Sequence, residues 1–377
     1  MPRISCHGRP ELNLTLKHLV LLGGGHAHVH VLKALTQEAL PSAHVTLVSP
    51  YARQVYSGMV PGLVAGHYNV DDCVIPLAPL AARAKVKFVQ SAATALDAKA
   101  RIVTLTNGQT LHYDALSLDT GPVMDRSAIP GADEHALFVR PIEDFMVLWD
   151  DLLALTQRQV LGVVVVGGGA AGVELALSLQ YRLGDRARVS LVTGGPPPLP
   201  SHPARVQARA LRALKRFGVT VLEDTCTAVS GNHVQLGRGM RLECDAPVLA
   251  LGASAPAWLR GSGLALDERG FVAIGNTLQS TSHPEVFAAG DVASNTTRPS
   301  PKSGVYAVRA GPPLALNLRR FVAAGELQAY RPPRRALNLL ACGERRAIAS
   351  WGPWSAEGGW VWWWKDRIDR AFVAAYR

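Results

Sequence analysis

VLLGGGHAHVHVL at residues 20–32 and VVVGGGAAGVELA at residues 164–176 are two copies of one pattern. Each copy is an apolar run typical of a buried strand, followed by a glycine turn and a helical pattern. The copies align without a gap at an offset of 144 residues, and HVTLVS at 44–49 then aligns with RVSLVT at 188–193. A glycine turn that opens a helix presents free N–H groups and the helix dipole to a pyrophosphate. Two such turns in register therefore predict two dinucleotide sites in one protein.

Length and composition fit a soluble α/β protein of two or three domains. The chain has 377 residues, 48% of them hydrophobic, and contains 35 glycines. Its formal net charge of +10 favours dinucleotide phosphates, anionic lipid or nucleic acid as partners. The arginines are scattered and no recognised nucleic-acid module occurs, so we predict that the chain does not bind nucleic acid.

The cysteines and the N-terminal segment indicate a reducing cytoplasm. The five cysteines lie far apart without a C-x-x-C pair, which argues against a metal site and against a disulfide framework. The start MPRISCHGRPELNLTL lacks the apolar stretch of a signal peptide. The hydrophobic run 160–179 contains the second glycine turn and Glu174, so we interpret it as a strand and a helix and predict no transmembrane span.

The duplication extends to whole domains. In the first half we expect strands at 17–22, 44–49 and 113–121, a helix at 28–39, a loop at 49–68, and a small antiparallel meander from 86–90, 101–106 and 109–112. In the second half we expect helices at 142–157, 172–183 and 204–217, strands at 188–193, 219–223 and 244–252, and a hairpin over 226–243. A strand at 283–293, a helix at 303–323, strands over 336–354 and a tail at 358–377 follow.

This order predicts an α/β fold with two Rossmann-like three-layer dinucleotide-binding domains and a small C-terminal α+β segment. We place the first domain at 14–125 and 255–325, the second at 126–254, and the C-terminal segment at 326–377.

The two glycine turns differ at their last position. The second has a full G-x-G-x-x-G ending at Gly172, whereas His28 stands at the matching position of the first. Either the helix lies slightly further from the strand or the His28 ring points into solvent, and we favour a ring that faces solvent or the phosphate. His26 and His30 share a helix face with each other, but both lie where the phosphate is expected, so we predict no metal there.

The strand ends that usually carry the ribose-binding acid are not acidic here. Ser49 and Thr193 occupy these positions, and no arginine stands at Thr193 or next to it to receive a 2′-phosphate. The sequence therefore leaves the choice between NADH and NADPH open.

Five motifs in order carry a family resemblance over residues 17–325. They are the first glycine turn, the Thr120–Gly121 turn, the second glycine turn, an Ala-Leu-Gly turn at 250–252 and VFAAGD at 286–291. In this order they resemble the two-dinucleotide flavoprotein reductases, which include type II NADH dehydrogenases, sulfide:quinone reductases and pyridine-nucleotide disulfide reductases. GGGHAHVHVL, the loop 49–68 and the Trp-rich end are most similar to NADH-dehydrogenase-like flavoproteins that sometimes occur fused to selenide, water dikinase.

The resemblance implies that the second unit is inserted in the first, and that the first unit holds FAD and the second NAD(P)H. Asp291 would bond the ribityl chain, Ala93 would lie against the adenine, and the loop 49–68 would lie near the ring. The implied FAD contacts are Gly23, Gly24, Gly25, His26, Ala27, Ser49, Pro50, Gly58, Ala93, Thr120, Gly121, Gly290, Asp291, Gly304 and Val305. The implied nicotinamide-nucleotide contacts are Gly167, Gly168, Gly169, Ala170, Gly172, Val173, Thr193 and Gly252.

Two charged residues are candidates for a catalytic role. The resemblance places Glu174 beside the nicotinamide; the alternative is a carboxylate favoured only by the helix dipole. Lys302, at the start of the helix after Asp291, would add positive charge beside the reduced flavin; the alternative is a solvated loop lysine.

The cysteines also limit which electron donors and acceptors the protein can use. The first helix has no cysteine pair, which excludes a disulfide reductase, and only Cys342 is placed to serve a sulfide:quinone reductase. We therefore predict an FAD-dependent oxidoreductase that passes a hydride from NAD(P)H to FAD and electrons to a quinone-type acceptor. A flavin-based redox sensor, similar in outline to apoptosis-inducing factor, is the alternative, and a sulfide:quinone reductase is a minor one.

The tail bears on location and assembly. Residues 351–377 hold six of the eight tryptophans together with basic residues such as Lys365 and Arg370. Such a segment is typical of an interfacial helix, so the protein is predicted to be cytoplasmic, either free or peripheral at the inner face of the membrane. The alternative is a cover over the core or a dimer contact, and Asp366 and Asp369 count against lipid. Monomer and homodimer both remain open.

Overall fold

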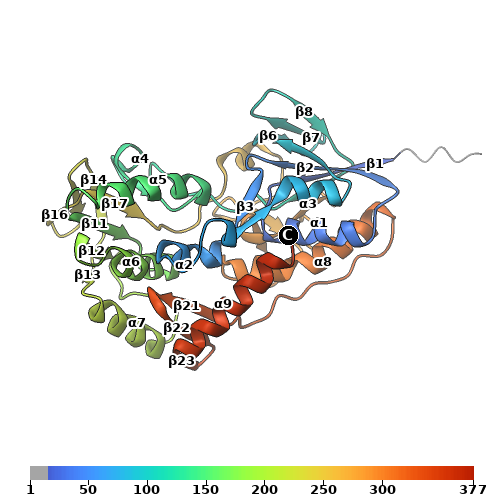
Figure 1. Ribbon diagram of the computed structural model, residues 1–377. Coiled ribbons are helices and arrows are strands. Elements are labelled where there is room, and N and C mark those ends of the chain that lie inside the picture. The colour runs from blue at the N-terminus through green and yellow to red at the C-terminus, as the bar shows by residue number, and fades with distance from the viewer. Residues whose placement is uncertain (1–15) are drawn as a thin grey trace, which may run out of the picture.

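The computed structural model describes residues 16–377 (Figure 1). The N-terminal segment 1–15, on which the absence of a signal peptide was predicted, lies outside the described residues, as do Cys6 and the first two residues of the predicted first domain.

The first glycine turn belongs to a five-stranded parallel sheet. Its order is β19 (Val286–Ala288), β9 (Ala115–Leu118), β1 (Lys17–Leu22), β2 (Ala43–Ser49) and β5 (Lys87–Gln90). Helices α1 (His26–Gln37) and α8 (Gly304–Val322) pack together on one face. The antiparallel meander β6 (Ala93–Asp97), β7 (Ile102–Leu105) and β8 (Thr110–His112) covers the other face, which gives three layers (Figure 1).

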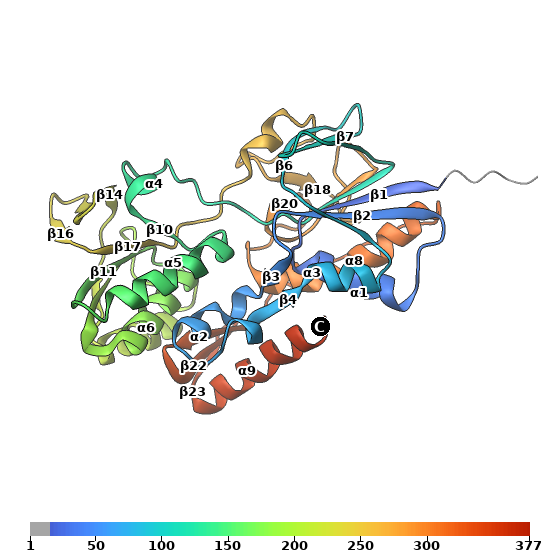
Figure 2. The ribbon, with the colours of Figure 1, turned by 45° about the horizontal axis from the view of Figure 1, so that its top comes forward.

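The second sheet repeats this arrangement. Its order is β10 (Leu137–Phe138), β17 (Ala246–Leu249), β11 (Leu161–Val166), β12 (Ala187–Val192) and β13 (Thr220–Leu222). The meander β14 (Cys226–Val229), β15 (His233–Leu236) and β16 (Arg241–Glu243) matches β6–β8. Helix α6 (Ala170–Leu183) packs below the sheet (Figure 2), and α7 (Ala204–Arg216) packs against α6.

The strand register confirms the repeat. Lys17 pairs with Ala43 in the first sheet, and Leu161 pairs with Ala187 in the second, so both partners keep the sequence offset. Only the edge strand differs: β10 precedes the second sheet, whereas β19 joins the first sheet after the second is complete. The second unit is therefore inserted in the first, and the predicted fold class is confirmed.

The first half departs from the sequence prediction in two places. Residues 86–90, assigned to the meander, form β5 of the parallel sheet, and the true first meander strand, β6, was missed. The expected loop 49–68 is largely structured. It contains β3 (Arg53–Val55), which pairs with β4 (Val74–Pro76), a 3-10 turn η1 (Ser57–Met59) and the short helix α2 (Val60–Val64). Its apolar side chains are buried, which explains why so long a segment is ordered.

Smaller elements complete the two units. They are η2 (Asp71–Cys73), α3 (Leu77–Arg83), α4 (Ala132–His135), α5 (Ile142–Leu155), η3 (Gly184–Arg186), η4 (Ala257–Gly261), β18 (Val272–Ile274), η5 (Gly290–Val292) and β20 (Ala293–Asn295).

The C-terminal segment is a three-stranded antiparallel sheet followed by one helix. β21 (Asn338–Cys342), β22 (Glu344–Trp351) and β23 (Trp354–Gly358) form the sheet, and α9 (Gly359–Ala374) runs back toward the first unit (Figures 1 and 2). Within residues 16–377, no helix combines the length and the apolar character needed to cross a membrane.

Candidate functional site

The first glycine turn leaves no room for side chains. At Gly23, whose φ is +99°, an added Cβ would collide with the backbone of Asp119, and at Gly24 it would collide with the Leu77 side chain. Glycine is therefore required by close packing as well as by the positive φ. The turn borders a cavity of about 620 Å³, a size typical of ligand sites.

Most of the predicted FAD contacts line this one cavity. Gly23, Gly24, Gly25, His26, Ser49, Pro50, Ala93, Thr120, Gly121, Asp291 and Gly304 all contribute to its wall. The four others lie beside it: Ala27 is buried in α1, Gly58 in the turn η1, Gly290 next to Asp291, and Val305 in the first turn of α8. Segments separated by more than 250 residues are thus brought together, as the resemblance implied.

Asp119 is a site residue that the sequence analysis missed. Its Oδ2 accepts hydrogen bonds from the backbone N–H of Ala27 at 2.8 Å and of His28 at 2.9 Å. These are two of the free N–H groups that we had expected to face the pyrophosphate. Burial raises the Asp119 pKa to about 7, with the nearby Asp291 carboxylate adding to the rise and these two hydrogen bonds opposing it. Asp119 directly precedes the Thr120–Gly121 motif, so its position in the sequence could have identified it as a site residue.

Asp291 lies near Asp119 and is paired with an arginine from another part of the chain. Arg140 Nη1 is 3.6 Å from Asp291 Oδ2, and both residues line the cavity. Burial raises the Asp291 pKa, while the Arg140 and Lys302 charges oppose the rise. Arg140 carried no motif, so only its place in the fold identifies it.

Three buried polar atoms around the cavity have no hydrogen-bond partner. They are His26 Nε2, Gln54 Oε1 and Ser303 Oγ, of which His26 and Gln54 line the cavity and Ser303 caps α8 beside Gly304. Burial lowers the His26 pKa to about 4, with Arg140 adding to the effect, so the ring is neutral at pH 7. Buried polar atoms without partners are costly in a finished fold, so this cavity is built for a polar ligand.

The expectation that the His28 ring faces solvent or the phosphate was wrong. The ring is fully buried and faces neither solvent nor the cavity. Its Nδ1 bonds the Gly23 carbonyl oxygen at 2.6 Å, and its Nε2 bonds Ser117 Oγ in β9 at 2.8 Å. The imidazole fills the space between α1 and the sheet, which the missing glycine would have closed by direct backbone contact.

The second glycine turn shows that tighter contact. An added Cβ at Gly172 would collide with the Gly167 carbonyl oxygen, so α6 packs directly on the turn. Cβ atoms added at Gly169 and Gly252 would meet nothing within 4 Å, so the mouth of this turn is open. Ala170 and Val173 follow in the first turn of α6, and the Thr193 hydroxyl donates to the Leu222 carbonyl oxygen at 3.4 Å.

A family model matches most of this architecture. The pyridine nucleotide-disulphide oxidoreductase model covers residues 17–311, which span both glycine turns and Asp291. The chain belongs to this family.

Other proteins and solved structures are similar to this chain over most of its length. The demethylphylloquinone reductase of Synechocystis is 27% identical over 286 residues, covering 72% of this chain and 71% of that protein. The type II NADH:quinone oxidoreductase of Staphylococcus aureus is 24% identical over 340 residues, covering 81% and 83%. NDH2 from Plasmodium falciparum in complex with NADH shares the fold, with a TM-score of 0.80, 14% identity and coverage of 95% and 97%. The sulfide:quinone oxidoreductase from Aquifex aeolicus has a TM-score of 0.79, 20% identity and coverage of 96% and 91%.

Lys302 does not line the large cavity in this oxidoreductase. Its Nζ donates to the Ala293 carbonyl oxygen and lies 3.8 Å from the centre of the Phe271 ring, in a small pocket on the other side of Asp291. Burial lowers its pKa to about 8, although the Asp291 and Asp267 charges oppose the change. The Lys302 charge therefore acts on Asp291, which lines the cavity, whereas a direct contact between Lys302 and a flavin stays a prediction.

Glu174 connects the inserted unit to the C-terminal sheet. Its Oε1 accepts a hydrogen bond from the Ala341 backbone N–H in β21 at 2.7 Å. Burial raises its pKa to about 7, while the Lys365 charge opposes the rise. A helix dipole alone does not account for this contact, and a role beside the nicotinamide stays a prediction.

Helix α9 presents a charged pair to the interior. Its buried residues are Val361, Lys365, Asp369 and Val373, spaced four apart along one face. We had counted Asp369 against lipid contact because we expected it at the surface. That expectation was wrong, since Asp369 is buried against Lys365 and the exposed face carries Trp360, Trp363 and Ile368.

Proposed function

We propose that this chain is an FAD-dependent NADH:quinone oxidoreductase. The observation that carries the proposal is the single cavity in which the first glycine turn, the Thr120–Gly121 turn and Asp291 meet. The second glycine turn, with its open mouth, provides a separate place for the nicotinamide nucleotide. The relatives named for NADH and quinone activities support this assignment over most of the chain length.

The residues present fit FAD. The glycine turn at 23–25 has no side chains, so a phosphate could approach its backbone closely. His26, whose Nε2 has no hydrogen-bond partner, lines the same cavity. Of the acidic residues that line the cavity, Asp119 contacts the N-terminus of α1 behind the glycine turn, and its raised pKa reduces its negative charge near neutrality. When bound, the flavin supplies the step between two-electron and one-electron chemistry.

The chain's own residues would then orient and shield the reaction. Asp291, held by Arg140, would accept hydrogen bonds from the ribityl hydroxyls. Helix α8 points its first residue, Gly304, into the cavity, so its positive end would stabilise negative charge developing there. Glu174, whose carboxylate is fixed by Ala341, would position the nicotinamide.

NADH is favoured over sulfide as the electron donor. Cys342 is buried, and burial raises its thiol pKa to about 12, so it is a poor nucleophile at pH 7. A sulfide:quinone reaction needs reactive thiolates, and this cysteine does not supply one.

We further propose that the protein is peripheral to the membrane through its C-terminal hairpin and α9. Trp351, Trp354, Trp360 and Trp363 are all exposed. Tryptophan is favoured at the boundary between lipid and water.

Anaerobic titration of the purified protein with NADH and with NADPH tests the enzyme assignment. We expect bound FAD, bleaching of its absorbance by a nicotinamide nucleotide, and rapid reoxidation by a soluble quinone. Protein without flavin, or flavin that neither nucleotide bleaches, would refute the proposal. Slow reduction coupled to a change in oligomeric size would instead favour the redox-sensor alternative.

A further inference from the structure

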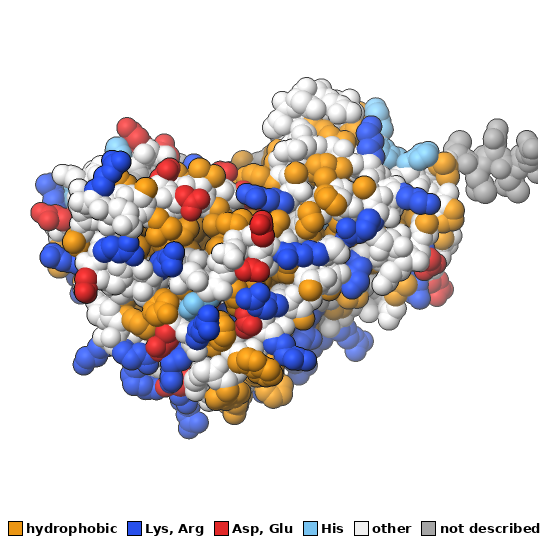
Figure 3. All heavy atoms as spheres, in the orientation of Figure 1, with side chains coloured by type: hydrophobic (Ala, Val, Ile, Leu, Met, Phe, Trp, Pro, Cys, Tyr) orange, Lys and Arg blue, Asp and Glu red, His pale blue; other side chains and the backbone are white. Residues whose placement is uncertain are grey.

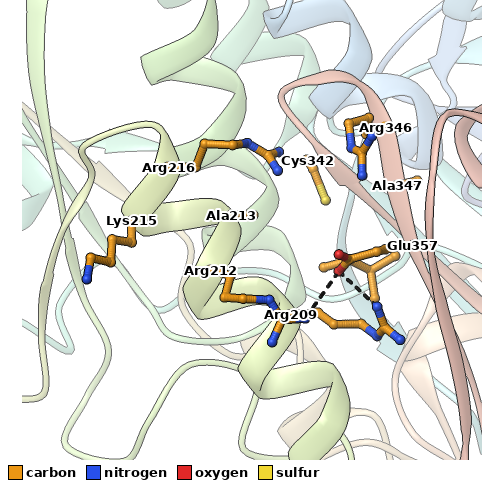
Figure 4. A pocket seen from close by; sticks show the side chains of 10 residues that line it. Arg209, Arg212, Ala213, Lys215, Arg216, Cys342, Arg346, Ala347 and Glu357 are labelled. Atoms are coloured by element: carbon orange, nitrogen blue, oxygen red, sulfur yellow. Dashed lines mark ion pairs between the residues drawn. The ribbon is translucent and has the colours of Figure 1, made fainter.

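A second cavity lies between helix α7 and the C-terminal sheet (Figure 4). Its volume is about 380 Å³, and it is separate from the cavity at the first glycine turn. Arg209, Arg212 and Arg216 reach it from α7, and Arg346 reaches it from β22. Figure 4 shows these side chains arranged around Glu357 and Cys342, whereas Lys215 points away.

The arginines outnumber the carboxylates that pair with them. Glu357 is shared by Arg209 at 3.2 Å and Arg212 at 3.7 Å. Glu344 is shared by Arg216 at 2.6 Å and Arg346 at 3.5 Å. Two carboxylates thus serve four guanidinium groups, all of which keep part of their surface in water. The excess positive charge and the spare N–H donors match a phosphate group.

The floor of the cavity is apolar. Ala213, Cys342 and Ile348 form it, and Cys342 remains a neutral thiol because burial raises its pKa to about 12. A free inorganic anion gains no contact from an apolar floor. An amphiphile would place its phosphate among the arginines at the rim and its apolar part against this floor.

The strands that carry the pocket also carry exposed tryptophans. β22 runs from Arg346 to Trp351, and β23 runs back from Trp354 to Glu357, so Trp351 and Trp354 are paired at the hairpin tip. At this end of the molecule Figure 3 shows many Lys and Arg side chains next to hydrophobic ones, below the elements that Figure 1 labels α7 and β23. Helix α7 has five basic residues and no acidic one. Basic residues beside interfacial tryptophans are what an anionic bilayer surface attracts.

We propose that the α7–β22 pocket binds the phosphate head group of an anionic phospholipid. This inference deepens the proposed peripheral attachment and rests on it. Because the pocket is on the inserted unit and the C-terminal sheet together, a bound lipid would hold these two parts against the same membrane.

The test is co-sedimentation of the flavin-loaded protein with vesicles of phosphatidylcholine, with and without phosphatidylglycerol. The variant is R212Q/R346Q, because each glutamate keeps its shorter ion pair, to Arg209 or to Arg216, and no carboxylate is left alone. The matched control is R238Q/R241Q, which removes the same charge from the β15–β16 hairpin. We expect phosphatidylglycerol to tighten binding, R212Q/R346Q to weaken it by about 25-fold, from about fivefold for each arginine, and the control to bind as the native protein does.

Several outcomes would overturn the lipid assignment. Equal binding by the variant and its control would show that charge in general, not this pocket, attracts the vesicles. A melting-temperature rise with glycerol phosphate in the native protein but not the variant, without vesicle binding, would identify a soluble phosphate ligand. A native dimer that R212Q/R346Q splits in sedimentation velocity would identify a contact between copies.

Reduction of a soluble quinone by NADH, measured without vesicles, is expected to be the same in all three proteins. Its absence from the native protein would count against the proposed enzyme activity, and loss of vesicle binding alone would count only against the pocket.

Discussion

Lys365 Nζ lies 2.6 Å from Asp369 Oδ2 in the interior, and the same ammonium group donates to the Gly58 carbonyl oxygen at 2.6 Å. Tyr56 also bonds the Asp369 carboxylate. Gly58 lies in the segment after β3 that the family resemblance places near the flavin ring. The pair therefore fastens the C-terminal helix to the predicted site, so that loss of α9 would alter the site as well as any membrane contact.

Removing one member of this pair is expected to be costly. Lys365→Met leaves Asp369 buried with only the Tyr56 hydroxyl, and the free energy of unfolding should fall by about 3–5 kcal/mol. Lys365→Met combined with Asp369→Leu removes both charges and should cost less than the single change. Chemical denaturation of the native protein and the two variants measures this difference, and a double variant that loses as much stability as Lys365→Met, or more, would contradict it.

His28 is expected to stabilise the first unit, although a glycine would restore the usual motif. His28→Gly leaves a cavity and deprives the Gly23 carbonyl and the Ser117 hydroxyl of their partner. We expect a loss of about 2–4 kcal/mol. The control is His44→Ala, an exposed histidine of β2, with an expected change below about 0.5 kcal/mol. Thermal unfolding of both variants measures the effect, and an unchanged or higher melting temperature for His28→Gly would refute this account.

Asp119 predicts a pH dependence of stability. Burial raises the pKa of Asp119 in the folded protein to about 7, well above its ordinary value of 3.8. Its contribution to the free energy of unfolding is therefore full below about pH 4 and is lost as the pH rises through about 7. Asp119→Asn keeps an oxygen that accepts the Ala27 and His28 N–H groups but does not titrate. The stability of the variant relative to the native protein should therefore rise between about pH 4 and pH 7 and then level off. Denaturation curves at several pH values measure the difference in free energy of unfolding between the variant and the native protein. The contributions of the other titrating groups cancel in this difference, so a difference that does not change with pH would contradict the raised pKa.

Glu174 is expected to act on the nicotinamide step. Glu174→Gln keeps an acceptor for the Ala341 N–H, so the fold should be retained, but the carboxylate is lost. We expect flavin reduction by NADH to slow about tenfold or more and to lose any pH dependence centred near 7. Stopped-flow reduction across pH measures both, with the melting temperature as a check on folding. A variant with native rates at every pH would leave Glu174 with a structural role only.

Sequence reasoning reached furthest where the signals are local. Glycines at 23–25 and 167–169 mark turns that exclude side chains, and the apolar periodicity around them predicts strands and helices without knowledge of the rest of the chain. Where the signal was weak, it failed: β6 carries three small residues in five and resembles a loop, so the meander was assigned one strand too early.

The sequence by itself determined the duplicated fold, the insertion, and the order of motifs at the cavity, because repeats and glycine turns are encoded by neighbouring residues. The tertiary structure alone decided how charged groups are partnered. Asp119 at the end of β9 meets the N-terminus of α1, Arg140 meets Asp291, and Lys365 reaches Gly58 across 307 residues of chain. A buried charge persists only beside its partner, and which partner packing brings near it depends on contacts that no local pattern contains.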